Sequence, residues 1–429
     1  MKKYFMSVAA LAGMMSLAAC SSDDIVSPAD NDVQTIKIAV ASTGDKSTRS
    51  RDLNSEEPNQ NIENVAVVIR DKANTVVYQK VITDWQTASN IYTENGHGRE
   101  YTLKLEKDQR LNAGEYTITA VGYTAGDFKS NTIVDATKGN VAAGNFTAEV
   151  ADGKAAQEAF AGESSIKLLE DHAAINPSVT LHRQVAGYYG YFTSIPVEVN
   201  SKKVTNVRLV ARSKNTKLTY GNFNSNFTTT NSDVMYVVNG SEPATTKDAK
   251  FKGSADNDAY TVYNIKVAEW FTKGDTNNDG ILDEKDALTK NGEEAWINPL
   301  KKSKVYETYQ KGTIFAGGFA VPFAATDAAT LELQLLDAKG EILKAWTVEM
   351  AAAQPTGQDV DKVALPTETT QNFSFFRNHM YTLGKKVDNT DNKPGTTTPD
   401  QPEPLDKSQS MILRVNDNWE VINRMTIGD

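Results

Sequence analysis

Residues 62–82, IENVAVVIRDKANTVVYQKVI, decide the class of fold that this chain adopts. Two runs rich in valine and isoleucine, Ile62–Arg70 and Thr75–Ile82, flank the short polar segment Asp71–Asn74. β-Branched residues favour extended strands, and a short polar interruption between two such runs is typical of a hairpin. The stretch therefore predicts two antiparallel strands joined by a turn.

Short runs of the same kind recur along the chain on both sides of this hairpin. Further predicted strands are Val33–Val40, Tyr101–Leu105, Tyr116–Tyr123, Ser178–Leu181, Tyr188–Phe192, Val197–Asn200, Lys203–Ser213, Val234–Val238, Tyr260–Trp270, Thr313–Phe323, Leu331–Asp337, Glu341–Glu349 and Phe373–Lys385. The stretch Ala142–Leu169, rich in alanine, glutamate and lysine, is instead expected to hold a short helix or an ordered loop. Strands at this spacing without regular helices between them predict an all-β fold of antiparallel sandwiches.

The length of the chain is sufficient for two domains or three. We expect one sandwich over residues 52–177 and another over residues 178–387, divided near Asn176-Pro177.

The N-terminus has the features of an export signal. Met1–Ala19 carries Lys2 and Lys3 and then an apolar run that is too short to remain as a membrane-spanning helix. The segment Leu17-Ala18-Ala19-Cys20 resembles a bacterial lipobox, which implies lipidation of Cys20, and the following Ser21–Asp24 resembles the acidic tract that directs Bacteroidetes lipoproteins to the outer surface. Cys20 is the single cysteine, so no intramolecular disulfide can form. One acylated terminus predicts an outer-membrane lipoprotein that is anchored rather than membrane-spanning.

Charge and motif content narrow the classes of function. A net charge of −10 and a pI near 5.1 argue against nucleic acid and against an anionic membrane surface as partners. The membrane therefore enters only through the lipid on Cys20. No nucleophile elbow or phosphate-binding loop is present, and none of the four histidines, His97, His172, His182 and His379, has a metal-ligand partner at helical or hairpin spacing. We expect no enzymatic activity, although glycoside hydrolysis by paired carboxylates stays open because such pairs are recognisable only in a fold.

The C-terminal residues 411–429, MILRVNDNWEVINRMTIGD, alternate between apolar and polar positions. The apolar face consists of Met411, Leu413, Val415, Trp419, Val421, Met425 and Ile427. A period of two is the pattern of a strand with one buried face. Residues 388–407, rich in proline, threonine and aspartate, predict a flexible linker ahead of it. The pattern predicts that residues 408–429 form a donor strand that docks in another molecule; the alternative is an edge strand of its own domain.

A metal-binding motif lies in the second domain. Residues 275–286, DTNNDGILDEKD, fit the EF-hand loop D-x-[DN]-x-[DN]-G, with Leu282 at the hydrophobic eighth position. The predicted ligands are the side chains of Asp275, Asn277, Asp279, Asp283 and Asp286 and the backbone carbonyl of Ile281. Oxygen ligands without a nearby cysteine or histidine predict Ca²⁺ in a structural site. The alternative is a solvated turn rich in asparagine, aspartate and glycine.

Three local sequences resemble the Bacteroidales fimbrillins. They are the strand IENVAVVI at residues 62–69, LHRQVA at residues 181–186, and RNHMYTL at residues 377–383, which is similar to the family's near-terminal strand. Together with the lipobox and the trailing strand, the resemblance covers most of the chain. Residues 272–311 match nothing in the family and are expected to form an insertion.

The resemblance implies two transthyretin-like sandwiches and assembly as a type V pilus by strand exchange. It implies that residues 20–51 are a propeptide, removed by a cut after Arg49 or Arg51 that takes away the strand Val33–Val40. The vacated groove would then accept the tail of another copy or of a related pilin, since exposed strand edges template β-augmentation.

We therefore expect a subunit of a cell-surface fimbrium, most simply of its shaft, that supports adhesion to host or bacterial surface ligands. The alternative is that Arg49 and Arg51 are uncut surface charges. The chain would then remain a monomeric lipid-anchored protein, either a pilus anchor or a Ca²⁺-dependent glycan-binding protein.

Overall fold

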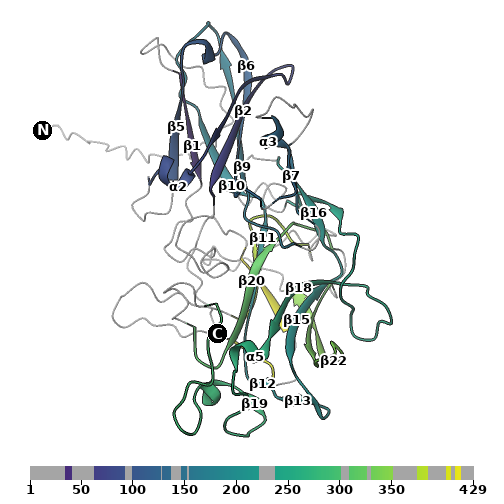
Figure 1. Ribbon diagram of the computed structural model, residues 1–429. Helices are drawn as coiled ribbons and strands as arrows, with labels where there is room; N and C mark the ends of the chain where they lie inside the picture. The colour runs from purple at the N-terminus through teal and green to yellow at the C-terminus, as the bar shows by residue number, and fades with distance from the viewer. Residues whose placement is uncertain are drawn as a thin grey trace, which may run out of the picture.

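The structure is a computed structural model. It describes residues 34–40, 62–91, 99–126, 128–136, 146–151, 154–221, 237–300, 309–325, 330–350, 374–384, 402–406 and 411–416. The described residues are mostly β-strand with a few short helices, which confirms the predicted all-β class. Two sandwiches lie end to end, with β1, β2, β5, β6, β9 and β10 in one and β11, β15, β18, β20 and β22 in the other (Figure 1).

The first sandwich is a single eight-stranded sheet folded over on itself. Its strand order is β3 (Val76–Ile82), β2 (Asn64–Asp71), β6 (Gly114–Tyr123), β9 (Phe160–Leu168), β10 (Ser178–Arg183), β1 (Gln34–Val40), β5 (Arg99–Leu105) and β4 (Asn90–Ile91). The β2–β3 pair confirms the predicted hairpin. The first half of β10 pairs with β1 and its second half pairs with β9, so β10 joins the two layers. Alternate apolar side chains of both layers meet in one core.

The second sandwich repeats this plan. Its strand order is β18 (Tyr260–Lys266), β15 (Asn206–Ala211), β21 (Leu331–Leu336), β22 (Ile342–Met350), β25 (Met411–Asn416), β23 (Met380–Leu383), β11 (Ala186–Thr193) and β20 (Ile314–Ala320), and β24 (Glu403–Pro404) adds to β11. Here β25 joins the layers, since its first half pairs with β22 and its second half with β23. The core includes an aromatic stack in which the ring centroid of Phe375 lies 4.6 Å from Phe323 and 4.0 Å from Tyr381.

A smaller sheet and a shared core connect the two sandwiches. The strand order of the smaller sheet is β17 (Gly240–Pro243), β16 (Asn215–Thr219), β8 (Thr147–Glu149) and β7 (Ser130–Asn131). Helix α3 (Thr132–Ala136) follows β7. The guanidinium Nη2 of Arg183, the last residue of β10, lies 2.8 Å from Oε1 of Glu158, just ahead of β9, and both side chains are buried. Breaking such a buried pair is costly, so it ties the end of β10 to the segment ahead of β9.

Short elements complete the fold. Helix α2 (Trp85–Ala88) places buried Trp85 in the first core, and a 3₁₀ helix covers Lys107–Gln109. The pairs β12 (Ile195–Pro196) with β19 (Ile281–Leu282) and β13 (Glu198–Val199) with β14 (Lys202–Lys203) lie near helix α5 (Val267–Trp270), at the end of the second sandwich far from the first (Figure 1).

Several details differ from the sequence predictions. Strand β10 belongs to the first sandwich, so the division falls between Arg183 and Ala186 rather than near Asn176-Pro177. The stretch expected to be helix or loop at residues 142–169 contains strands β8 and β9. The pairs β1–β10, β11–β23, β11–β24 and β22–β25 are parallel, so the sandwiches are not purely antiparallel. No hairpin turn joins the members of these pairs, and nothing therefore forces an antiparallel register.

Candidate functional site

Strand β1 fills an interior position of the first sandwich. It pairs antiparallel with β5 from Gln34 opposite Leu105 to Val40 opposite Arg99, and parallel with β10 from Lys37 opposite Ser178 to Val40 opposite Leu181. Ile36, Ile38 and Val40 are fully buried in the core. The strand predicted to be removable is thus hydrogen-bonded to a neighbouring strand on each side. Its loss would leave two unpaired strand edges and uncover the apolar core beneath it.

Gln34 anchors the first end of β1 with its side-chain amide, which is fully buried. The amide Nε2 donates to the carbonyl oxygens of Leu111 at 3.1 Å and Ala173 at 2.9 Å, and the Leu111 N–H donates to Oε1 at 2.7 Å. We call these three backbone groups, the N–H and C=O of Leu111 and the C=O of Ala173, the amide socket. Sequence analysis missed Gln34, although a glutamine in phase with Ile36 and Ile38 is the signal that could have shown it.

The tail lies in its own sandwich over residues 411–416. Met411–Leu413 pair with Val348–Met350 of β22, and Arg414–Asn416 pair with Thr382–Met380 of β23. The described part of the predicted donor strand is therefore paired within its own sandwich, between β22 and β23 rather than at an edge. Of the predicted donor residues, Met411, Leu413 and Val415 lie in β25, whereas Trp419, Val421, Met425 and Ile427 lie outside the described residues.

The end of the predicted linker is also packed rather than free. Glu403–Pro404 form β24 beside β11, and Leu405 is fully buried with its N–H donating to the Thr193 carbonyl oxygen at 3.0 Å. The chain is thus fastened to the second sandwich immediately before the tail strand.

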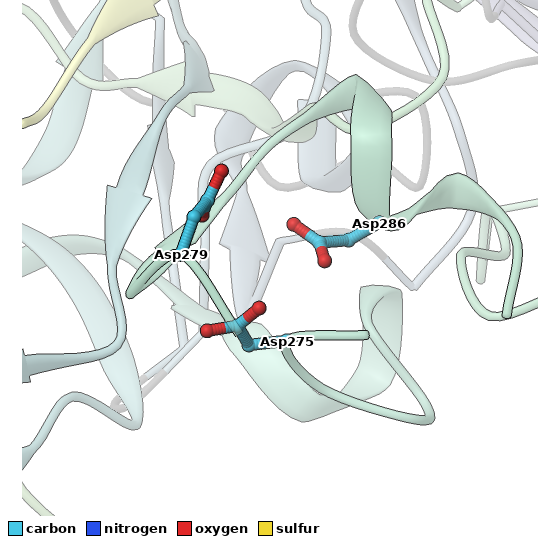
Figure 2. Close-up of side chains that lie close together, drawn as sticks. All are labelled: Asp275, Asp279 and Asp286. Atoms are coloured by element: carbon cyan, nitrogen blue, oxygen red, sulfur yellow. The ribbon is translucent and has the colours of Figure 1, made fainter. Parts of the chain in front are cut away.

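The predicted calcium loop brings three carboxylates together. Single oxygens of Asp275, Asp279 and Asp286 all lie within 4.8 Å of one another, and their side chains face a common point (Figure 2). Asp286 is fully buried, Asp275 is half-buried and Asp279 is exposed. Gly280 has a φ of +84°, which allows the sharp turn between positions five and seven of the motif.

Backbone N–H groups hold these carboxylates in place. Asp286 Oδ1 accepts from Thr276 N at 2.7 Å and its Oδ2 from Asp283 N at 3.1 Å, while Asp275 accepts from Asn278 N at 2.6 Å and Gly280 N at 2.9 Å. Asp286 belongs to a reciprocal cap, in which Asp283 Oδ1 accepts from Lys285 N at 2.8 Å at the start of the 3₁₀ helix Glu284–Ala287.

The other predicted ligands are engaged differently. Asp283 is not part of the three-carboxylate group and acts as the helix cap instead, and Asn277 Oδ1 accepts from Asp279 N at 2.9 Å. Ile281 lies in β19 opposite Pro196. The hydrogen bond from Asn277, followed by those from Ile281 N and Lys285, lowers the pKa of Asp279, whose Oδ2 lies 3.3 Å from Lys285 Nζ. The three converging hard oxygens fit a divalent cation such as Ca²⁺, whereas the Lys285 ammonium pairs with one of the three carboxylates, that of Asp279.

A glycine outside the motif supports the loop. Gly312, with φ of +76°, packs so closely on the Asp283–Glu284 peptide that a Cβ would come within 2.2 Å of Glu284 N. This contact comes from the segment after the insertion, and no motif in the loop itself indicates it.

Other predicted positions lie outside the described residues, namely Cys20, Arg49 and Arg51. Among the helices of the described ranges, none combines the length and the apolar character needed to cross a bilayer.

No known protein-family model matches the chain, and no curated protein matches it in sequence. Among solved structures, it is similar to a fimbrial assembly protein from Parabacteroides distasonis, with 13% identity, 83% of this chain and 92% of the other covered, and a TM-score of 0.36. It is also similar to a candidate adhesin from Bacteroides ovatus (10% identity, 82% and 89% covered, TM-score 0.39) and to a candidate cell adhesion protein from P. distasonis (10% identity, 90% and 96% covered, TM-score 0.40). These similarities are too distant to assign a function.

Proposed function

We propose that this chain is a structural subunit of a cell-surface fimbrium, most simply of the shaft of a type V pilus. It would be exported as a lipoprotein through Cys20, cut after Arg49 or Arg51, and polymerised by exchange of β-strands between copies. The observation that carries the proposal is the place of β1, since every cut within residues 41–61 separates this interior strand from the sandwich that it completes.

The physical consequence of such a cut is an open slot between β5 and β10. Its walls would be unpaired N–H and C=O groups along Arg99–Leu105 on one side and Ser178–Leu181 on the other. Its floor would be the apolar core that Ile36, Ile38 and Val40 now cover. Such a slot is suited to an incoming strand with one apolar face.

The tail strand β25 suits the role of the incoming strand. Within the described residues 411–416 it pairs with three residues of each neighbour, whereas β1 pairs over all seven of its residues with β5. A tail strand that left its place between β22 and β23 and entered the slot between β5 and β10 would form more backbone hydrogen bonds with its neighbours. Each is worth about 0.5–1.5 kcal/mol net.

An oligomerisation assay tests the proposal. The purified full chain, treated with an arginine-specific protease, is expected to form a ladder of oligomers that resists mild denaturant. Deleting residues 411–429 should abolish the ladder, and the variant Arg49→Lys with Arg51→Lys should remain uncut and monomeric. Ladders that persist without the tail would exclude it as the donor.

N-terminal sequencing of the mature surface protein separates this proposal from its alternative. A start at Ser50 or Asp52 fits a polymer subunit, whereas a lipidated Cys20 fits a monomeric anchored protein.

We also propose that the loop at residues 275–286 binds Ca²⁺ as a structural ion. The convergence of Asp275, Asp279 and Asp286 supports this, because three like charges this close repel one another and the single ammonium of Lys285, beside Asp279, offsets that repulsion only in part. Calorimetry on the wild type and on Asp275→Ala tests it. Equal Ca²⁺ binding by both proteins would remove the loop as the site.

A further inference from the structure

The slot that β1 occupies is selective at its first position. The amide socket offers a buried acceptor and a buried donor on Leu111 and a partly buried acceptor on Ala173, and all three are satisfied by the single side-chain amide of Gln34. An apolar residue there would leave them unpaired, and each buried unpaired group costs about 1–3 kcal/mol. The three following inward positions, those of Ile36, Ile38 and Val40, are fully buried and accept only apolar side chains. The slot therefore selects an amide followed by apolar residues two, four and six positions later.

One segment near the C-terminus has this pattern. Residues 409–415 read QSMILRV, and β1 reads QTIKIAV. Gln409 aligns with Gln34, the apolar residues Met411 and Leu413 align with Ile36 and Ile38, and Val415 aligns with Val40. The hydroxyl residue that follows the glutamine is present in both segments.

We infer that Gln409–Val415 of a second copy takes the place of Gln34–Val40, in a register fixed by Gln409 in the amide socket. The inference rests on the proposed function, because the slot opens only when β1 is removed. It adds to that function that residues 409–415 are the part of the tail that fills the slot.

The places of Thr35 and Lys37, which are partly exposed, and of Ala39, which is buried, give a second comparison of the two segments. Thr35 Oγ1 donates to the Ile175 carbonyl oxygen at 3.3 Å, and the hydroxyl of Ser410 can replace it. Glu100, which lies opposite Ala39, now pairs with Lys37 at 3.5 Å. Removing β1 takes away Lys37, and the aligned residue opposite Glu100 becomes Arg414, which brings an opposite charge across the strands at the place of Ala39, itself 7% exposed.

A competing register begins at Asn423, the other amide followed by apolar residues. Met425 and Ile427 would take the places of Ile36 and Ile38, but Asp429 and the chain terminus would fall at the fully buried place of Val40. Burying a carboxylate in an apolar site is strongly unfavourable. The side chain of asparagine is also one methylene shorter than that of glutamine, so it reaches the socket less well.

Disulfide trapping distinguishes the two registers. Thr102 lies opposite Lys37 on the exposed face of β5. Ile412 aligns with Lys37 in the inferred register, and Thr426 aligns with it in the competing one. The full chain in a Cys20→Ser background, which has no other cysteine, would carry Thr102→Cys with either Ile412→Cys or Thr426→Cys. Both proteins are cut with the arginine-specific protease, oxidised and run on a non-reducing denaturing gel.

The inferred register predicts covalent dimers and longer species for Ile412→Cys, and none for Thr426→Cys. If ladders form in mild denaturant but the cross-link forms only through Thr426→Cys, or through neither cysteine, the inferred register is wrong. Strand exchange itself would still hold. A cross-link inside one chain would overturn the choice of a second copy as the occupant. The absence of any ladder from the cut wild type would overturn both this inference and the proposed function.

A second pair of variants tests the socket itself. Gln409→Leu should increase the rate of ladder dissociation in mild denaturant about tenfold or more, whereas Asn423→Leu should leave it unchanged. Thermal unfolding of the uncut proteins checks that both variants fold. An unchanged dissociation rate for Gln409→Leu would overturn the role of its amide.

Discussion

At the scale of single residues, the first sandwich depends on a polar side chain in an apolar strand. Gln34 is the one amide among the inward-facing residues of β1, and it satisfies three backbone groups, two on buried Leu111 and one on half-buried Ala173. Replacing it with leucine keeps the volume similar but removes every one of these hydrogen bonds.

We expect Gln34→Leu to lower the free energy of unfolding of the uncut chain by about 2–5 kcal/mol, since buried groups left unpaired each cost about 1–3 kcal/mol. Chemical denaturation followed by tryptophan fluorescence measures this, because Trp85 lies in the same core. Lys37→Met, which removes only a partly exposed ion pair, is the control and should change stability little. Equal effects of the two substitutions would contradict the role given to the amide.

His379 makes the second sandwich sensitive to pH. Burial, with a smaller effect of the nearby Arg377 charge, lowers the pKa of His379 to about 4, and its ring Nδ1 lies 2.7 Å from the Arg377 carbonyl oxygen. The unfolded chain takes up this proton near pH 6.5, whereas the folded chain takes it up only near pH 4. Stability is therefore unaffected above pH 6.5 and falls as the pH drops from 6.5 to 4.

The wild type should lose about 3 kcal/mol of stability from this group between pH 6.5 and pH 4. His379→Asn, which keeps a donor for the Arg377 carbonyl but does not titrate, should lose correspondingly less. Urea unfolding at both pH values measures the difference. An identical loss in the two proteins would show that His379 is not the group responsible.

At the scale of elements, the proposed release of β25 would have to overcome the packing of Leu405 and β24 just before it. Leu405 is fully buried and β24 is only two residues long. Leu405→Ala should weaken this anchor, because leucine-to-alanine changes in a core cost about 2–5 kcal/mol. We expect the cut variant to form its ladder several-fold faster than the cut wild type, with the same final distribution of oligomers.

A time course on gels measures the rate of ladder formation. Leu343→Ala, in the neighbouring strand β22, is a control for general loosening of the second core. If Leu405→Ala forms the ladder at the wild-type rate or more slowly, β24 does not restrain the tail.

Local patterns predicted most of the strands because alternation and turn residues act within a few positions. The β2–β3 hairpin and strands β1, β5, β6 and β11 occur close to their expected places. The calcium loop is similarly local, and its Asp275, Asp279 and Asp286 do converge.

Features set by distant partners were not predictable from the same patterns. Strand β10 carries an ordinary strand pattern, and only its pairing with β1 and β9 assigns it to the first sandwich. The tail has the pattern of a buried strand, but the sequence could not say whose sheet buries it. Asp283 fits a ligand position in the motif, and its carboxylate also caps the following helix, a role that the motif pattern does not indicate.

At the scale of the whole molecule, the two sandwiches have complementary roles in the proposed assembly. The first holds β1, joined to the rest of its sandwich only through residues 41–61, and the second holds β25 near the end of the chain. Each is a strand that lies between two neighbours without a hairpin to either. In the proposed assembly, the first strand is removed and the second is offered to another copy.

Electron cryomicroscopy of the protease-cut oligomer tests the central claim most directly, because it identifies the strand that lies between β5 and β10. The account predicts a strand from the tail of the neighbouring copy in that place, with β25 absent from between β22 and β23 of its own chain. Finding Gln34–Val40 still in the slot, or β25 still paired within its own sandwich in every copy, would contradict the account.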